Sequence, residues 1–332
     1  MQRIGILGAG AWGTALAMTA RRAGRDVVIQ AHEPDVARDI NDDHKNERYL
    51  PGVALDPAIR ATTDVADAVR ADAVLIVVPA QHARDVLRRA APHWPADTPA
   101  VVCAKGIEQR THALMSEVVS ASVPAAPVAA LSGPSFAAEV AHELPAAVTL
   151  ACRDDTVLKT LPGALGTRGF RIYSSDDVIG CELGGAIKNV LAIACGIAIG
   201  RGLGDSARAA LITRGLAEMT RLAVALGAHA ETLAGLSGLG DLVLTCNAMQ
   251  SRNFSFGVAL GHGRALHAIL AERPGVTEGV FTAASVVARA REHRVPMPIC
   301  EAVDAVLNRD ADLNDSIMAL LARPFRPEGW AT

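Results

Sequence analysis

The stretch Gly8-Ala9-Gly10-Ala11-Trp12-Gly13 decides the fold of this chain. It follows an apolar run, residues 3–7, and precedes residues 14–23, whose spacing predicts a helix that closes at Gly24. Glycines at Gly8, Gly10 and Gly13 let a backbone turn approach a pyrophosphate, and a helix N-terminus supplies N–H groups and partial positive charge. A glycine turn that holds no ligand is the alternative. The strand before the turn and the helix after it favour a dinucleotide site.

Strand and helix patterns alternate through the first half of the chain, and only helical patterns follow residue 176. Near-continuous apolar strands alternating with helices indicate a doubly wound parallel sheet of the Rossmann type. We expect an α/β dinucleotide-binding domain over residues 1–178 and an all-α domain that binds substrate over residues 179–332. The predicted strands are residues 3–7, 26–30, 73–78, 100–103, 128–131, 147–151 and 170–173; the predicted later helices are residues 178–199, 206–226, 241–249, 265–271, 283–293 and 299–307.

Composition narrows the class of protein. The 332 residues carry a net charge of −3, and no basic stretch is interleaved with aromatic residues, so we expect neither nucleic-acid binding nor attraction to an anionic membrane. The six cysteines form no Cys-x-x-Cys pair, which leaves a metal site unsupported and fits a reduced cytoplasmic protein. The apolar run 190–200 is too short to span a bilayer, and the N-terminal residues lack the apolar core of a signal peptide.

The choice of dinucleotide depends on residues near the end of the second predicted strand. An acid that binds the ribose 2′-hydroxyl is expected about 20 residues after the glycine turn. Glu33 has that spacing but lies beyond the strand, after His32. His32 can accept a 2′-phosphate and Glu33 would oppose one. We expect the chain to use both NAD and NADP, with a preference for NADP.

Two further predicted strands end in residues suited to a polar pocket. Lys105 follows one strand, and Gly133-Pro134-Ser135 follows another. An ordinary turn and helix cap would also explain Gly133-Pro134-Ser135. Because ligands of open α/β sheets lie at the carboxyl ends of the strands, a pocket beside the nicotinamide explains both features together.

One lysine stands out in the helical half. Only four of the 32 basic residues are lysines, and Lys188 lies within an apolar, glycine-rich run, residues 182–197. A desolvated lysine can exchange a proton near neutral pH, whereas arginine stays protonated. A lysine whose ammonium group merely extends to water is the alternative.

Two polar groups follow Lys188 in the sequence. Asp241 follows a glycine-rich turn and can place a carboxylate at a helix start, and Ser251-Arg252-Asn253 combines donors suited to a phosphate. Taken singly, these residues also fit a helix cap and surface charge.

Taken in order, these segments resemble the bacterial NAD(P)-dependent glycerol-3-phosphate dehydrogenases over nearly the whole chain. The resemblance implies a Rossmann domain, a helical domain like that of 6-phosphogluconate dehydrogenases, and an oxidoreductase that reduces dihydroxyacetone phosphate to sn-glycerol 3-phosphate, the backbone of glycerophospholipids. The segments that carry it are Gly8-Ala-Gly-Ala-Trp-Gly-Thr-Ala, Ala104-Lys105-Gly106, Leu131-Ser-Gly-Pro-Ser-Phe-Ala137, Glu182-Leu-Gly-Gly-Ala-Ile-Lys188-Asn189, Ile212-Thr-Arg-Gly-Leu-Ala-Glu218, Gly238-Leu-Gly-Asp241-Leu-Val-Leu-Thr-Cys, Ser251-Arg-Asn253 and Val276-Thr-Glu278-Gly.

The resemblance also implies a role for each matching residue. Lys188 would be the general acid and base, with Asn189 and Asp241 as neighbours. The phosphorylated substrate would contact Lys105, Gly133, Ser135, Lys188, Asp241, Ser251, Arg252 and Asn253, and the cofactor would contact the glycine turn with Ala11, Trp12, His32, Lys105, Ala137, Arg252, Val276 and Glu278. The chain departs from the family pattern at Ala11, Ser206 and Phe254-Ser255-Phe256.

Two other functions remain open at this level. A β-hydroxyacid dehydrogenase of the same architecture would act on an unphosphorylated substrate and would not need Ser251-Arg252-Asn253. A non-catalytic dinucleotide sensor would need the glycine turn but not Lys188. A homodimer formed through the apolar helices is compatible with the sequence, which does not settle the oligomeric state.

Overall fold

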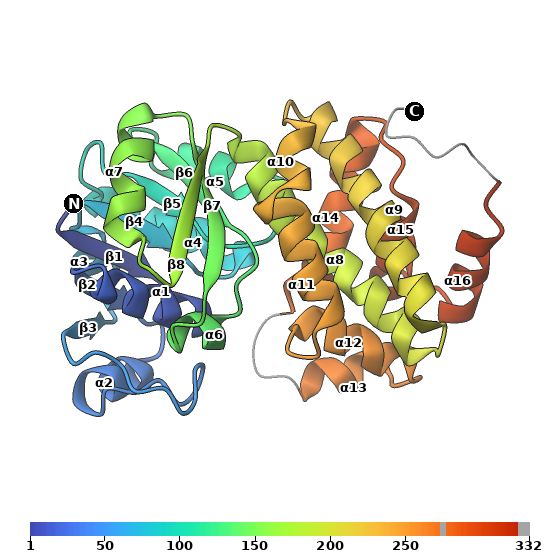
Figure 1. Ribbon diagram of the computed structural model, residues 1–332, viewed down its shortest axis with the longest axis horizontal. Helices are drawn as coiled ribbons and strands as arrows, with labels where there is room; N and C mark the ends of the chain where they lie inside the picture. The colour runs from blue at the N-terminus through green and yellow to red at the C-terminus, as the bar shows by residue number, and fades with distance from the viewer. Residues whose placement is uncertain (273–276, 325–332) are drawn as a thin grey trace. The chain divides into compact units, whose positions relative to one another are not determined.

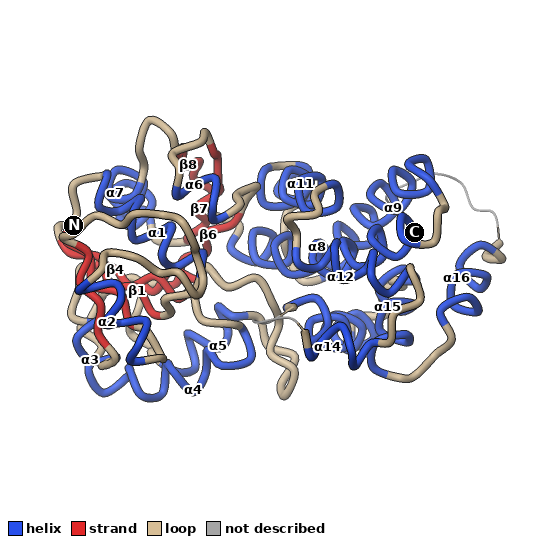
Figure 2. Tube along the Cα trace, turned by 90° about the horizontal axis from the view of Figure 1, so that it is seen from below, coloured by secondary structure: helices blue, strands red, loops and turns tan. Residues whose placement is uncertain are grey.

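The computed structural model describes residues 1–272 and 277–324, and the chain divides into two compact units. Unit 1 contains residues 1–104 and 115–178. Unit 2 contains residues 105–114 and the chain from residue 179 onward. Strands are drawn only in unit 1, whereas the described part of unit 2 consists of helices and loops (Figure 2).

Unit 1 is built on an eight-stranded sheet with the order β3-β2-β1-β4-β5-β6-β7-β8. The chain leaves β1 toward β2 and β3, and then returns to the other side of β1 with β4. Ligands of open α/β sheets bind beside such a switch point. The strands are β1 Arg3–Leu7, β2 Asp26–Gln30, β3 Ile59–Thr62, β4 Ala73–Ile76, β5 Ala100–Val102, β6 Val128–Ser132, β7 Ala146–Cys152 and β8 Phe170–Ser175.

The predicted doubly wound parallel sheet is confirmed, with one antiparallel pair, because β7 runs opposite to β6. The other strand pairs are parallel. The connection from β6 to β7 contains only a five-residue helix, α6 Ala137–Ala141. Such a helix rises about 7 Å, whereas β6 advances about 17 Å. The chain is therefore not carried back to the start of the sheet, and the next strand runs in the opposite direction.

Helices cover both faces of the sheet, with α1 and α7 on one side and α3, α4 and α5 on the other (Figure 2). The core consists of small and branched side chains on the strands and on α1; Ile4, Ile6 and Leu75 are fully buried. The helices of unit 1 are α1 Ala11–Arg22, α2 Pro34–Asp42, α3 Val65–Val69, α4 Ala80–Ala90, the short η1 Ala91–His93, α5 Met115–Ser122, α6, and α7 Asp155–Leu165.

Unit 2 is organised around the long helix α8, Val178–Gly200, which carries Lys188 (Figure 1). Among the described residues, α8 is the one helix long and apolar enough to cross a membrane, but 83% of its most apolar window is buried inside the protein. It is therefore the core helix of this unit. The remaining elements are α9 Gly204–Ala225, α10 Ala230–Ala234, η2 Leu236–Gly240, α11 Asp241–Asn247, α12 Arg252–Gly261, α13 Leu266–Ala271, α14 Glu278–Glu292, α15 Pro298–Asn308 and α16 Leu313–Leu321.

Helices α8 and α12 are in backbone contact through glycines. A Cβ built on Gly196 would lie 2.1 Å from the carbonyl oxygen of Phe254, and one on Gly257 would lie 2.2 Å from that of Ile193. One turn further on each helix, a Cβ on Gly200 would lie 2.3 Å from the carbonyl oxygen of Val258, and one on Gly261 would lie 2.6 Å from that of Ile197. Small residues four apart on both helices allow this approach, as in closely packed helix pairs elsewhere.

Every predicted strand overlaps an observed one, but several elements were missed. Strand β3 has only four residues, and α6 and α10 are one-turn helices. Residues 252–261 form α12, and Asp312 caps a last helix, α16, before Arg323. Short elements give too few positions for a periodic pattern to stand out from chance.

Candidate active site

Lys188 lies on α8 in the core of unit 2, with 7% of its surface exposed. Its neighbours Ile187 and Leu191 are fully buried. The ammonium group is not extended to water. It donates hydrogen bonds to Oδ1 of Asp241 and, at 2.9 Å, to Oγ1 of Thr245. Asp241 therefore lies beside Lys188, as the family resemblance implied.

Asp241 is shared by two lysines. Its Oδ2 accepts a hydrogen bond from Lys105 Nζ at 2.6 Å, while its Oδ1 accepts the one from Lys188. The carboxylate is 1% exposed. With both lysines protonated, the cluster carries one net positive charge in a buried place, so an anionic group or a developing oxyanion would be stabilised there.

The surroundings lower the pKa of Lys188 from 10.5 to about 8. Burial is the largest cause, because it disfavours the charged ammonium group. Asp241 raises the pKa and the nearby Lys105 lowers it. Lys188 thus remains mostly protonated at neutral pH but can exchange its proton close to that pH.

Glycines bring Asp241 to the lysine helix. The turn η2 runs directly into α11, of which Asp241 is the first residue. A Cβ on Gly184 of α8 would lie 2.3 Å from the carbonyl oxygen of Ser237 in that turn. Only glycine allows such an approach between backbones. Gly184 in the Lys188 segment therefore has a structural role that is separate from proton chemistry.

Asparagines hold the other parts of the cluster in place. Nδ2 of Asn189, next to Lys188, donates to the carbonyl oxygen of Lys105 at 3.0 Å. Nδ2 of Asn253 donates to Oδ1 of Asn189 at 2.9 Å, and Oδ1 of Asn253 accepts from the backbone N–H of Gly279 at 3.0 Å. The start of α14 is thus connected, through α12 and α8, to the backbone of Lys105.

The three residues Ser251-Arg252-Asn253 have different environments. Ser251 caps α12, since its hydroxyl accepts from the N–H of Phe254 at 3.2 Å. Asn253 is buried and engaged as described, whereas Arg252 is exposed. Phe254 and Phe256, where the chain departs from the family pattern, are core residues. The interpretation as a helix cap is confirmed for Ser251, and Arg252 is the exposed cation of the three.

In unit 1, the glycine turn joins β1 to α1 as predicted, although α1 begins three residues before the predicted start. Gly8 has a φ of +107°, which favours glycine. A Cβ on Gly13 would lie 1.9 Å from the carbonyl oxygen of Gly8, whereas one on Gly10 would meet no atom within 4 Å. Gly13 is needed for the turn itself, and Gly10 faces open space at the helix N-terminus.

The residues at this turn fit a dinucleotide. No side chain caps the N-terminus of α1, so its first N–H groups remain available for a phosphate. The indole Nε1 of Trp12 is buried and has no hydrogen-bond partner among the described residues. A buried donor without an acceptor is costly, and an acceptor on a bound ligand would relieve that cost.

The end of β2 carries the residues expected to distinguish NAD from NADP. His32 is exposed. Oε1 of Glu33 accepts from the hydroxyl of Tyr49 at 2.7 Å and lies 4.0 Å from the guanidinium of Arg48. Glu33 is therefore partly neutralised by partners of its own. Arg48 and Tyr49 were not identified from the sequence, because they lie in an irregular segment without a motif.

The remaining predicted residues are placed as follows. Gly133 follows β6 with a φ of +151°, and a Cβ there would lie 2.8 Å from Cα of Val148. The hydroxyl of Ser135 donates to the carbonyl oxygen of Gly133, and Ala137 begins α6. Glu278 is the first residue of α14. Val276 lies outside the described residues.

A sheet whose first six strands have the order 3-2-1-4-5-6 with a glycine turn after β1, together with a helical unit that buries a lysine against a carboxylate, is typical of two-unit dinucleotide-dependent dehydrogenases. Family comparison specifies the class further. Residues 3–158 match the N-terminus and residues 177–318 the C-terminus of NAD-dependent glycerol-3-phosphate dehydrogenase.

Individual relatives agree with the family match. The chain is 59% identical to a glycerol-3-phosphate dehydrogenase [NAD(P)+] of Rhodospirillum rubrum over 99% of this chain and 95% of that protein, and 56% identical to one of Parvibaculum lavamentivorans over 98% of each. A crystal structure of glycerol-3-phosphate dehydrogenase from Coxiella burnetii superposes with a TM-score of 0.93, at 41% identity, over 97% of this chain and 99% of that one. The chain belongs to the NAD-dependent glycerol-3-phosphate dehydrogenase family.

Proposed function

We propose that Lys188 supplies the proton when this chain reduces dihydroxyacetone phosphate to sn-glycerol 3-phosphate with NADH or NADPH. The observation that carries the proposal is the buried cluster of Lys188, Asp241 and Lys105 with its single net positive charge. As the C2 carbonyl is reduced, its oxygen gains negative charge. An ammonium group stabilises that charge and then donates its proton, which is the role of a general acid. In the reverse reaction the neutral amine accepts the proton.

The bound nicotinamide supplies the hydride. The glycine turn after β1 and the N-terminus of α1 would hold its pyrophosphate. We assign the cofactor contacts to Gly8, Gly10, Ala11, Trp12, Gly13, His32, Lys105, Ala137, Arg252, Val276 and Glu278.

Arg252 is the residue we assign to the substrate phosphate. Its exposed, forked guanidinium suits a bidentate contact with a phosphate. A phosphate held away from C2 also orients the carbonyl toward Lys188. Asp241 and Lys105 would act near C2, because the carboxylate of Asp241 accepts hydrogen bonds from both Lys105 and Lys188. The other proposed substrate contacts are Gly133, Ser135, Ser251 and Asn253.

The finer features of the function are proposals as well. Residues 1–178 would form the dinucleotide-binding domain and residues 179–332 the substrate-binding and catalytic domain. NADPH would be preferred, since exposed His32 can bind a 2′-phosphate while Glu33 is engaged by Tyr49. The enzyme would act in the cytoplasm as a homodimer and supply the backbone of glycerophospholipids.

The pH dependence of reduction tests the assignment of Lys188. The protonated lysine is the active form for reduction, so kcat/KM should fall as the pH rises through about 8, the pKa of Lys188. The oxidation of glycerol 3-phosphate needs the neutral amine and should rise over the same interval. A reduction rate that is flat through this interval would contradict the assignment.

Substitution of Arg252 tests the phosphate contact and separates the rival functions. Arg252→Gln should raise KM for dihydroxyacetone phosphate with a smaller change in kcat. Arg291→Gln, an exposed arginine near the end of α14, is the matched control for loss of a surface charge and should leave that KM unchanged. Turnover of an unphosphorylated hydroxy acid but not of dihydroxyacetone phosphate would favour a β-hydroxyacid dehydrogenase. Cofactor binding without turnover of either would favour a sensor.

A further inference from the structure

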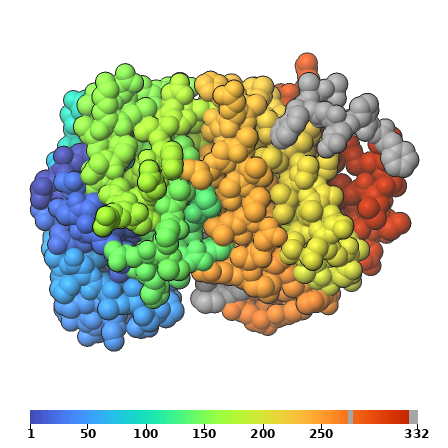
Figure 3. Space-filling model, viewed as in Figure 1, coloured from blue at the N-terminus to red at the C-terminus, as the bar shows by residue number. Residues whose placement is uncertain are grey.

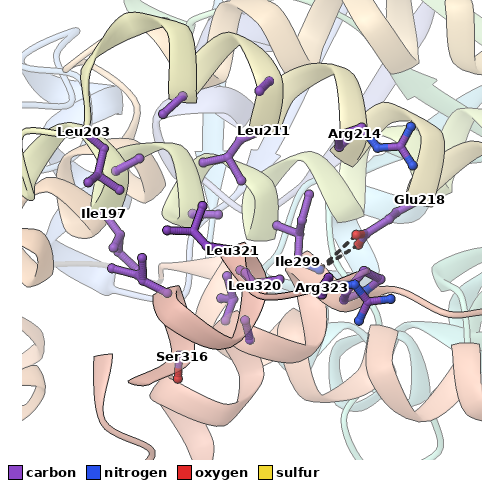
Figure 4. A pocket seen from close by; sticks show the side chains of 18 of the residues that line it. Ile197, Leu203, Leu211, Arg214, Glu218, Ile299, Ser316, Leu320, Leu321 and Arg323 are labelled. Atoms are coloured by element: carbon purple, nitrogen blue, oxygen red, sulfur yellow. Dashed lines mark hydrogen bonds between the residues drawn. The ribbon is translucent and has the colours of Figure 1, made fainter. Parts of the chain in front are cut away.

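A second candidate site lies in unit 2, in a groove bordered by α9, α15 and α16 (Figure 4). Its volume is about 600 Å³, within the range of small-molecule sites, and its lining is mainly aliphatic. Neither Lys188 nor Asp241 lines it. Helix α9 lies at the surface of unit 2, where its yellow atoms are visible in Figure 3. No residue of α16 is buried, although Leu313, Ile317 and Leu320 form an apolar stripe on the groove side.

The groove is polar at one end and apolar at the other. Arg214, Glu218 and Arg323 lie together at one end in Figure 4, and Ile197 and Leu203 lie at the opposite end. An occupant that fits such a groove has one polar end and one aliphatic end. A uniformly polar metabolite such as the proposed substrate would leave the aliphatic lining without a partner.

The polar end favours an anion. Arg214 and Arg323 are exposed and form no ion pair with any residue in the described part of the chain. The carboxyl of Glu218 is engaged elsewhere, because its Oε1 accepts from the backbone N–H of Ile299 at 2.9 Å. Burial raises the pKa of Glu218 to about 7, which weakens its negative charge near neutral pH. Positive charge therefore dominates at this end.

The length of the aliphatic part matches one acyl chain. Leu203, Ala207, Leu211 and Arg214 lie along one face at the start of α9 and line the groove. From Leu203 to Arg214 the helical rise is about 16 Å. One leaflet of a bilayer, which is the depth of one acyl chain, is about 15 Å thick in its hydrocarbon part.

We propose that this groove binds a single-chain acyl amphiphile with an anionic head group, the chain lying along α9 and the head at Arg214 and Arg323. A free fatty acid and an acyl ester that carries a phosphate share this chemistry. The site is separate from the Lys188 cluster and does not depend on the proposed reaction.

Amphiphiles with one tail and different heads test the proposal on the full chain. Dodecanoate, dodecyl phosphate and dodecyltrimethylammonium, each below its micellar concentration, would compete with a fluorescent fatty acid for the protein. The two anions should displace the probe with a stoichiometry of one, and the cation should be at least about tenfold weaker. The tighter of the two anions indicates whether a carboxylate or a phosphate is the natural head.

Two variants separate the head contact from the tail contact. Arg214→Gln should weaken both anions about tenfold, because a charge-assisted hydrogen bond is lost. Arg208→Gln is its control, since Arg208 is paired with Asp205 on the same helix and does not line the groove. Ala207→Trp should fill the groove and abolish binding of every tail, whereas Ala209→Trp, on the exposed side of α9, should not.

Three results would overturn the proposal. The first is equal binding of anions and the cation, and the second is binding that Ala207→Trp leaves unchanged. The third is no binding by the wild-type protein. In that case the oligomeric states of the wild-type protein and of Ala207→Trp, measured by sedimentation, would be compared. A loss of the oligomer in Ala207→Trp would indicate that a second copy of the chain covers the groove. Retained reduction of dihydroxyacetone phosphate by each variant excludes misfolding as the cause.

Discussion

The glycine turn of unit 1 and the lysine cluster of unit 2 are built in opposite ways. The turn lies within six consecutive residues, and its critical contact joins Gly8 and Gly13. The cluster brings together Lys105, Lys188 and Asp241, which are separated by 83 and 53 residues in the chain. A contact within one turn is specified locally, whereas the cluster exists only when several helices pack correctly. Substitutions in the turn should therefore affect unit 1 and cofactor binding only. Substitutions in the cluster should affect both the catalytic rate and the packing of unit 2.

The largest effect is expected from Lys188→Ala. Loss of a general acid typically costs about 10²–10⁴ in rate, so kcat for reduction should fall by that factor or more. Lys188→Arg keeps the charge but cannot release a proton, and it should be similarly impaired. Cofactor binding, followed by fluorescence, should be unaffected in both. Normal turnover by a folded Lys188→Ala protein would show that Lys188 is not the general acid. The cluster in unit 2 would then have only a structural role.

Asp241→Asn should damage both activity and stability. The substitution leaves buried Lys188 and half-buried Lys105 without their carboxylate, and breaking a buried ion pair typically costs about 3–5 kcal/mol. Asp241 raises the pKa of Lys188, so its removal should lower that pKa and move the fall of kcat/KM for reduction to lower pH. Denaturant unfolding and a pH–rate profile measure the two effects.

Thr245→Val is the matched control for Asp241→Asn. It removes a hydrogen bond to Lys188 without removing a charge. A pH profile that shifts equally in both variants would contradict the electrostatic account.

In unit 1, Gly13→Ala and Gly10→Ala should separate folding from binding. The new methyl group at residue 13 would collide with the carbonyl oxygen of Gly8, so unit 1 should be destabilised by about 1–3 kcal/mol even without cofactor. At residue 10 the methyl group meets only open space, so stability should change by less than about 0.5 kcal/mol while the cofactor Kd rises. Thermal unfolding with and without NADPH measures both. Equal destabilisation by the two substitutions would refute the assignment of the open space to a ligand.

A change confined to the pH dependence of stability is expected from the long-range contact of Glu218. Its pKa is raised to about 7 in the folded chain, above the ordinary 4.5, because burial disfavours the carboxylate. The folded state therefore holds the proton more tightly, and stability should decline as the pH rises from about 4.5 to about 7, by up to about 3 kcal/mol. Glu218→Gln should remove most of this decline, as measured by chemical unfolding at both pH values. A decline that persists in Glu218→Gln would assign it to other groups.

The sequence predicted the local features well and the long-range ones only in part. The turn at Gly8 and the strands beside it could be identified because each depends on a few adjacent residues. Lys188 stood out as a rare lysine in an apolar run, but its contact with Thr245 was not identified. Thr245 is four residues after Asp241, on the same helical face, and that spacing was the available signal. The reversal of β7 depends on how far one connection reaches, which residue patterns do not encode.

The glycine contacts between α8 and α12 have a consequence for engineering the enzyme. Because the backbones of α8 and α12 are in contact at Gly196 and Gly257, the distance between the two helices and their register along each other are fixed. Arg252 is the first residue of α12, so its position is set by this helix contact, in which Arg252 itself takes no part. Under the assignment of Arg252 to the substrate phosphate proposed above, its side chain is a point at which substrate selectivity would be redesigned while the scaffold stays fixed. A larger residue at Gly257 would displace α12 and, under the same assignment, would change that selectivity without altering Arg252 itself.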